Sequence, residues 1–308
     1  MKDILTMWRY PKMVAITALS AALYAAVLIP FKGIMVLPHI DMRIATAMVP
    51  AMGIMFGPAG AFGAAIGNLI GDFFGGITLG SSFGMISNFF FAYVPYKVWY
   101  AMRGDNRPRT NTKRKLMKYV AASVAATLAE MSILCAGIGG VTQSLPYTVL
   151  PPVLLITNGL VPLVLGGALI QLFGPRLEKW NLLFTQIMSP DDVPRRRRTN
   201  MLGVVLMVAG SAASIAAGLY MSIVVGKPVG LPLLAATGPF LLVFLVGNFL
   251  VGVDRKEFDD EDDDLDDELD NDLNNDLDRA VDRVAPPPIP SRAEHGRAEE
   301  TIRLKDGL

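Results

Sequence analysis

Five long stretches without a single charged residue most constrain what this chain can fold into. They run from Met13 to Phe31, Ile77 to Tyr96, Met131 to Pro175, Met201 to Val225 and Val229 to Val253. A helix needs about 20 apolar residues to cross the ~30 Å hydrocarbon layer of a bilayer, and several of the stretches reach that length. The sequence therefore predicts an all-α integral membrane protein and excludes a soluble enzyme.

Eight segments are apolar enough for us to expect membrane-crossing helices. Six precede a basic linker and two follow it, at Lys12 to Ile29, Ile44 to Gly57, Pro58 to Gly76, Ser82 to Met102, Tyr119 to Val141, Tyr147 to Phe173, Met201 to Val225 and Leu231 to Val253. The second segment is too short to cross squarely, because a helix rises only about 1.5 Å per residue. We expect it to form a tight hairpin with the third segment, turning at Gly57-Pro58-Ala59-Gly60.

The zero net charge of the chain is a cancellation between two regions. Of 28 acidic residues, 20 follow Val253 together with only 8 of the 28 basic ones, so the tail is strongly negative and the rest equally positive. Lys and Arg concentrate before the first segment, after the fourth and after the sixth, and basic loops face the cytoplasm. With an even number of spans, both termini are expected to be cytoplasmic.

The tail, residues 254–308, carries leucines at 265, 269, 273 and 277 among Asp, Asn and Glu. The spacing suits one face of a helix, but the density of like charge and the poor helix propensity of Asp and Asn favour a solvated, disordered tail. Docking of the tail on the basic loops of the same chain, or on a partner, stays open as the alternative.

Two rows of small residues recur at four-residue spacing. Gly63, Gly67, Gly71 and Gly75 form one face of the third segment, and such faces let membrane helices approach closely. We interpret this row as a helix-packing surface. Ala18, Ala22 and Ala26 form a second row on the first segment, which by its residues alone could pack internally or dock a partner helix.

Polar and ionisable residues inside a membrane are costly and typically functional. Arg43 opens the second segment, Asp72 lies near the end of the third, and Glu130 lies midway along the fifth. A purely structural ion pair of Arg43 with Asp72 or Glu130 is one interpretation. The other is a polar lining for a flat, hydrogen-bonding, vitamin-sized heterocycle, with candidate binding residues His39, Asp41, Arg43, Asn88, Glu130, Gln143 and Asn158.

Motifs for nucleotide hydrolysis and common enzyme chemistry are absent. The sequence has no G-x-x-x-x-G-K-[ST], H-E-x-x-H or G-x-S-x-G, and Cys135 is its single cysteine. We therefore expect no catalytic residue, no cofactor, no metal site and no nucleic-acid partner. Uphill transport would need an ion gradient or another subunit.

Three strings resemble the substrate-binding S components of energy-coupling-factor vitamin transporters. They are ALSAALYAAVLIPF (Ala18 to Phe31), IDMRIATAMVPAMGIMFGPAGAFGAAIGNLIGDFFGG (Ile40 to Gly76) and LGSSFGMISNFFFAYVPY (Leu79 to Tyr96). FGPAGAFGAAIGNLIGD (Phe56 to Asp72) is the most specific, because it is similar to the family's G-P-x-x-G turn followed by a glycine-spaced helix. The Arg-initiated second segment looks most like the branch for queuosine precursors.

The resemblance implies capture of a vitamin-like ligand in a prokaryotic cell membrane, with a membrane coupling subunit and cytoplasmic ATPases as partners. It implies that Ala18, Ala22 and Ala26 face the coupling subunit and that the pocket lies near the extracellular face. We expect a six-helix domain at 1–178, a basic linker at 179–200, two added helices at 201–253 and the tail at 254–308. These additions depart from the six-helix pattern, so a stand-alone secondary transporter and a membrane sensor or scaffold signalling through the tail remain alternatives.

Overall fold

A computed structural model of the chain describes residues 2–31, 34–37, 40–41, 43–102, 106–195 and 198–253. The chain divides into a unit from Met1 to Asp262 and a second from Asp263 to Leu308. Every described residue belongs to the first unit. The predicted acidic tail lies outside the described residues.

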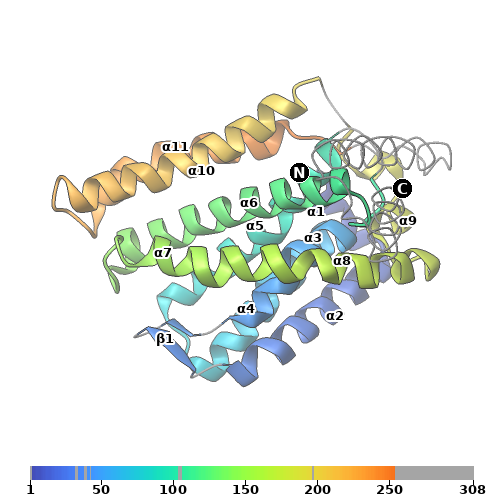
Figure 1. Cartoon of the computed structure of the whole chain (residues 1–308), viewed down its shortest axis with the longest axis horizontal. Helices are drawn as coiled ribbons and strands as arrows, with labels where there is room; N and C mark the ends of the chain where they lie inside the picture. The colour runs from blue at the N-terminus through green and yellow to red at the C-terminus, as the bar shows by residue number, and fades with distance from the viewer. Residues whose placement is uncertain are drawn as a thin grey trace, which may run out of the picture. The chain divides into compact units, whose positions relative to one another are not determined.

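Six main helices build the N-terminal bundle (Figure 1). They are α2 (Pro11–Leu28), α3 (Met48–Phe56), α4 (Pro58–Gly75), α5 (Leu79–Ala101), α6 (Lys113–Cys135) and α8 (Val161–Lys179). α6 continues as a π-helix, η4 (Ala136–Thr142), and α8 is entered through α7 (Leu150–Leu154) and a second π-helix, η5 (Leu155–Leu160). Short elements flank these helices: α1 (Lys2–Thr6), η1 (Met7–Arg9), η2 (Ile29–Phe31), β1 (Met35–Leu37), β2 (Ile40–Asp41), η3 (Ile44–Ala47), α9 (Phe184–Ile187) and η6 (Pro190–Asp192).

The prediction of an all-α integral membrane bundle is confirmed. A helical segment coincides with each of the eight expected apolar segments, apart from shifts of a few residues at their ends. Within the described part of the chain, five helices are long and apolar enough to cross a membrane: Pro11–Phe31, Lys113–Thr142, Leu150–Ile187, Asn200–Ile223 and Leu231–Leu250. Ile44–Phe56 is a shorter apolar helix, in line with the length of that segment.

The turn between α3 and α4 is made by a single glycine. Gly57 has φ +57° and ψ −130°, a backbone conformation that L-residues rarely adopt. Pro58 follows as the first residue of α4, where the missing N–H of proline costs nothing. The expected hairpin at Gly57-Pro58 is therefore present, and it brings α4 back alongside α3.

The glycine face of α4 lies against α2. A Cβ added at Gly63 would lie 2.3 Å from Cβ of Ser20, and one at Gly71 would lie 2.5 Å from Cδ2 of Leu28. A Cβ added at Gly67 would lie 2.7 Å from the carbonyl oxygen of Ala21. Gly75 is exposed at the end of α4 and contributes to a cavity described below.

The two added helices pack on the bundle. α10 (Asn200–Ile223) and α11 (Leu231–Leu250) form an antiparallel hairpin, which we call the C-terminal hairpin, and it lies beside α5 and α6 (Figure 1). Its buried apolar side chains join those of the two helices in one cluster, with Val94 and Val98 from α5, Ala122, Ala125 and Ala129 from α6, and Val204, Met207 and Phe244 from the hairpin. The predicted boundary at residue 201 thus separates sequence segments whose side chains share a core.

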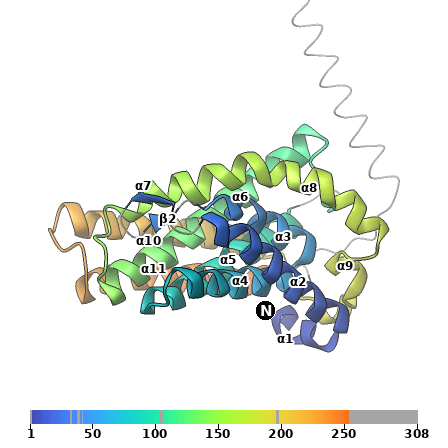
Figure 2. The ribbon, with the colours of Figure 1, turned by 90° about the horizontal axis from the view of Figure 1, so that it is seen from below.

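The bundle has two chemically different ends. We call one the basic end, because the first turns of α6 and the last turn of α8 place Lys113, Arg114, Arg176 and Lys179 there. β1, β2 and α7 lie at the opposite end, the β end, away from α1 and α9 (Figure 2).

A buried ion pair ties three segments together at the basic end. Lys97 of α5 and Asp3 of α1 are both fully buried, with Nζ 3.6 Å from Oδ2. Lys97 also donates to the carbonyl oxygen of Val251 at 3.2 Å, directly after α11. Tyr93 donates its hydroxyl to the Asp3 carboxylate at 3.1 Å. A buried charge needs such partners, so this cluster joins the N-terminus and the C-terminal hairpin to the bundle.

Candidate functional site

A cavity of about 490 Å³ opens at the β end of the bundle. Its volume lies within the range of roughly 300–1,000 Å³ that is typical of small-molecule sites. Arg43, the end of α4, the start of α5, the last turn of α6, η4 and the loop after η4 form its walls. The lining residues are Arg43, Asp72, Gly75, Gly76, Thr78, Leu79, Gly80, Ser81, Gly84, Leu134, Ile138, Thr142, Ser144 and Leu145.

A hydrogen-bonded chain leads from Arg43 into α4. Arg43 directly precedes η3 and donates from Nη1 to Oδ1 of Asn68 at 3.4 Å. Asn68 donates from Nδ2 to Oδ2 of Asp72 at 3.2 Å, because residues four apart share one face of a helix. Asn68 and Asp72 are both buried. The guanidinium and the carboxylate are thus joined through an amide at the wall of the cavity.

A second hydrogen-bonded pair, Tyr24 and Asn88, connects α2 and α5. Tyr24 donates its hydroxyl to Oδ1 of Asn88 at 3.1 Å, and Nδ2 of Asn88 donates to the carbonyl oxygen of Gly84 at 2.9 Å. Both side chains are buried. Tyr24 and Asn88 thus add a second buried polar pair to the inside of the bundle.

Glu130 of α6 and Asn158 of η5 form a buried pair. Nδ2 of Asn158 donates to Oε1 of Glu130 at 2.8 Å. Oε2 of Glu130 and Oδ1 of Asn158 are buried and have no hydrogen-bond partner among the described residues. Buried polar atoms of native proteins are nearly always partnered. Both atoms accept hydrogen bonds, so what this pair lacks is a donor.

Asn158 owes its place to a π-helix. In η5 the backbone bonds run from residue i to i+5, which adds a residue to the turn and often marks a functional site. Neighbouring helices hold this turn, since Thr46 donates to the carbonyl oxygen of Thr157 at 2.9 Å and Thr127 to that of Asn158 at 3.3 Å. The arrangement aims the Asn158 amide at α6.

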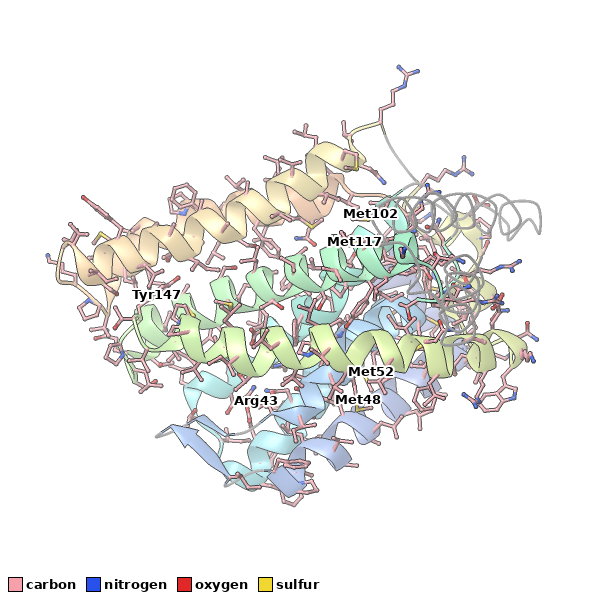
Figure 3. All side chains as sticks on the ribbon, viewed as in Figure 1. Arg43, Met48, Met52, Met102, Met117 and Tyr147 are labelled. Carbon is pink, nitrogen blue, oxygen red and sulfur yellow. The ribbon has the colours of Figure 1, made fainter. Side chains whose placement is uncertain are left out.

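Four of the seven predicted binding residues come together inside the bundle. Glu130 bonds to Asn158, Arg43 bonds to Asn68, and Asn88 bonds to Tyr24; in Figure 3, Arg43 and Tyr147 lie on the side of the bundle away from Met102. Asp41 lies in β2, where the structure describes only the backbone, and His39 lies outside the described residues. Gln143 is exposed and has φ +54°, with its amide next to Gly230 and not among the cavity-lining residues.

The structure adds two polar residues that the sequence analysis does not single out. Asn68 lies one turn before Asp72 in the string GNLIGD, and Tyr24 lies in the alanine-rich first helix. The four-residue spacing to Asp72 is the signal that could have found Asn68. No comparable spacing points to Tyr24, whose partner Asn88 is 64 residues away.

The row of Ala18, Ala22 and Ala26 lies on the surface of α2. All three are exposed, and Leu19 and Leu23 beside them are 54% and 44% exposed. Gly63, Gly67 and Gly71 of α4 contact the opposite face of α2. The alanine row therefore does not pack against the described part of this chain.

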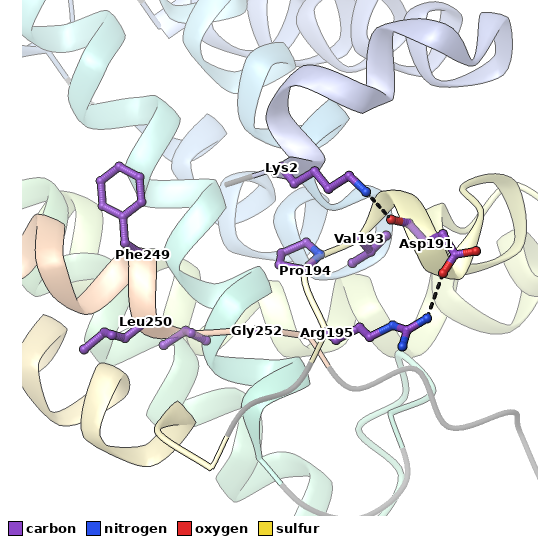
Figure 4. Close-up of a pocket in the computed structure, with 9 residues that line it drawn as sticks. Lys2, Asp191, Val193, Pro194, Arg195, Phe249, Leu250 and Gly252 are labelled. Carbon is purple, nitrogen blue, oxygen red and sulfur yellow. Dashed lines mark hydrogen bonds and ion pairs between the residues drawn. The ribbon is translucent and has the colours of Figure 1, made fainter.

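A larger cavity of about 780 Å³ lies at the basic end, between the N-terminus, the linker after α9 and the end of α11 (Figure 4). Its polar groups already bind one another. Lys2 donates to the carbonyl oxygen of Asp191 at 2.6 Å, and Arg195 pairs with the Asp191 carboxylate at 2.8 Å. The unpartnered buried acceptors of Glu130 and Asn158 line neither cavity. Leu134, one turn after Glu130 on α6, does line the cavity at the β end, which is therefore the better candidate for a ligand.

Comparison with known proteins gives one match. The family model described as QueT transporter matches residues 14–175, just over half of the chain. No curated protein and no solved structure matches the chain. The matched region ends before the C-terminal hairpin and contains every polar residue of the site described above.

Proposed function

This chain belongs to the QueT transporter family, the S components of energy-coupling-factor transporters for queuosine precursors, and on that premise we propose that its β-end cavity captures a 7-deazaguanine-type ligand. The chain is a multi-pass membrane protein and a transporter component for a vitamin-like substrate. The identity of the ligand, the residues that bind it and the energy source are our proposals.

The two unpartnered acceptors on Glu130 and Asn158 carry the proposal. Neither residue lines the cavity, but Leu134, one turn after Glu130 on α6, does, so the ligand would reach the pair from the cavity. A ligand that fits them must present at least two N–H groups close together. The edge of a 7-deazaguanine ring does so, through its ring N–H and its exocyclic amine, and a carboxylate accepts such a pair well. Arg43 would supply a donor for the ring carbonyl, as the guanidinium has five N–H groups and the Asn68 contact occupies one.

We propose that the β end faces the outside and the basic end faces the cytoplasm. The basic residues at the first turns of α6 and the last turn of α8 support this orientation by the positive-inside rule. The cavity would then collect its ligand from outside the cell, and both termini would be cytoplasmic.

We further propose that partner ATPases energise uptake through a membrane coupling subunit that docks on α2. The sequence holds no phosphate-binding loop of its own. The exposed row of Ala18, Ala22 and Ala26 supports the docking site, because small residues let a second membrane helix approach closely.

Titration of the purified full-length protein with 7-aminomethyl-7-deazaguanine tests the ligand site. Glu130→Gln replaces a charged acceptor by a neutral amide, and a hydrogen bond to a charged group contributes about 1.5–3 kcal/mol. We therefore expect the affinity to fall by about 10- to 100-fold. Glu178→Gln is the matched control, since Glu178 pairs with Arg109 at the basic end, 3.1 Å away. Equal affinity of wild type and Glu130→Gln would place the ligand elsewhere.

A further inference from the structure

One wall of the ligand cavity is shared with the C-terminal hairpin. We call it the η4 wall, comprising residues 134–147: the end of α6, η4 and the following loop. Leu134, Ile138 and Thr142 face the cavity at four-residue spacing. Gly139 and Gly140 face α11, because a Cβ added to Gly140 would lie 2.4 Å from Cδ2 of Leu234, and one on Gly139 3.0 Å from Cδ2 of Leu233. A single π-helix thus separates the ligand cavity from the hairpin.

Backbone hydrogen bonds fasten the hairpin tip, residues 224–230, to this wall at two points. Gly230 donates its N–H to the carbonyl oxygen of Gly139 at 3.0 Å, and Tyr147 donates its N–H to the carbonyl oxygen of Pro228 at 3.1 Å. The cavity-lining residues Thr142, Ser144 and Leu145 lie between these two points. Both ends of the cavity-lining loop are therefore held by the hairpin.

The ring of Tyr147 adds a third attachment. It is fully buried in a cluster with Ile215 and Leu233 of the hairpin. A Cβ added at Gly218 of α10 would lie 2.2 Å from Cζ of this ring, so the ring occupies a notch that only glycine leaves open. The hydroxyl donates to the carbonyl oxygen of Ser214 at 3.4 Å. Figure 3 shows Tyr147 where the bundle meets the hairpin.

The η4 wall needs such support from outside. Its π-helix has the sequence AGIGGVT, with three glycines, and each glycine lowers helix stability by roughly 1 kcal/mol relative to alanine. From these contacts we propose that the C-terminal hairpin braces the η4 wall in its ligand-binding shape, with Tyr147, Gly139 and Gly218 as positioning residues. The inference rests on the proposed function, and it gives a role to helices that lie outside the matched residues 14–175.

Gly218→Ala in the full-length chain tests the brace. The added methyl group collides with the Tyr147 ring. Alanine has a higher helix propensity than glycine, so the substitution does not weaken α10 itself, and faster exchange would report displacement of the η4 wall. Without ligand, amide exchange across residues 139–147 should become about tenfold faster, because exchange reports local opening. The affinity for 7-aminomethyl-7-deazaguanine should fall by about tenfold. Ala216→Val is the control, since Ala216 is exposed on the same helix, and it should change neither quantity. Unchanged exchange and affinity in Gly218→Ala overturn the proposal.

A measurement on the wild-type protein keeps the test independent of folding and of the ligand. If the wall and the hairpin tip form one unit, the amides of Tyr147 and Gly230 exchange at similar rates in the ligand-free protein. Exchange of the wall more than about tenfold faster than the tip overturns the brace. Failure of the wild type to bind 7-aminomethyl-7-deazaguanine refutes the proposed ligand instead, while the ligand-free exchange still decides the brace.

Discussion

Lys97→Met removes the cation of the buried cluster at the basic end. The ammonium is fully buried, 3.6 Å from the Asp3 carboxylate and 3.2 Å from the carbonyl oxygen of Val251. It also lies 5.1 Å from the ring centroid of Tyr93. Methionine is unbranched and keeps most of the apolar part of the side chain, so the change removes chiefly the charge.

The magnitude follows from the burial of Asp3. Removing one partner of a buried ion pair leaves an uncompensated charge, which costs about 3–5 kcal/mol. Equilibrium unfolding of the full-length protein in detergent should therefore show an unfolding free energy lower than that of wild type by about 3–5 kcal/mol. Lys179→Met, exposed in the last turn of α8, should change the unfolding free energy by less than about 0.5 kcal/mol.

A double variant separates the charge from packing. Asp3→Asn with Lys97→Met removes both charges and should recover part of the loss, because no buried carboxylate is left unpaired. An unfolding free energy of Lys97→Met equal to that of wild type would contradict this expectation. It would mean that the ion pair does not hold α1 and the end of α11 to the bundle.

Two further predictions concern the faces of α2. Gly63→Ala should lower the unfolding free energy by about 1–3 kcal/mol through overpacking, since the new Cβ would lie 2.3 Å from Cβ of Ser20; an unchanged value in the same unfolding assay would contradict this packing. Ala22→Trp on the exposed row should leave ligand affinity unchanged but abolish co-purification of the coupling and ATPase subunits from the native host, whereas Val246→Trp, on an exposed position of α11, should retain them. Retention of the partners by Ala22→Trp would exclude α2 as their docking face.

The sequence predicts the helices well because membrane-crossing segments are long, apolar and free of charge. The Gly57-Pro58 turn is likewise readable, as Gly supplies the positive φ and Pro begins the next helix. The packing of the C-terminal hairpin on α5 and α6 is not readable. Two apolar helices in a membrane carry no periodic signal that names the neighbour they will contact.

The site is only partly predictable for a related reason. Glu130, Asn158, Arg43 and Asn88 stand out because polar groups in a membrane are costly. Tyr24 does not, since a tyrosine in an apolar helix is ordinary until its partner is known. Lys97 shows the same limit: the sequence does not name the partners that enclose it, Asp3, Tyr93 and Val251.

The π-helices explain why the site resists derivation from periodicity. A 3.6-residue repeat places side chains correctly only along an unbroken α-helix, and the sequence does not reveal where a residue is added to the turn. Asn158 points at Glu130, and Gly139 faces the C-terminal hairpin, because η5 and η4 shift the register.

A structure of the full-length protein with 7-aminomethyl-7-deazaguanine bound would show whether the Glu130–Asn158 pair binds the ligand. We expect the ring at the β-end cavity, reaching inward so that ligand N–H groups lie about 2.7–3.2 Å from Oε2 of Glu130 and Oδ1 of Asn158. A ligand bound in the basic-end cavity, or one that leaves both oxygens without a donor, would contradict it.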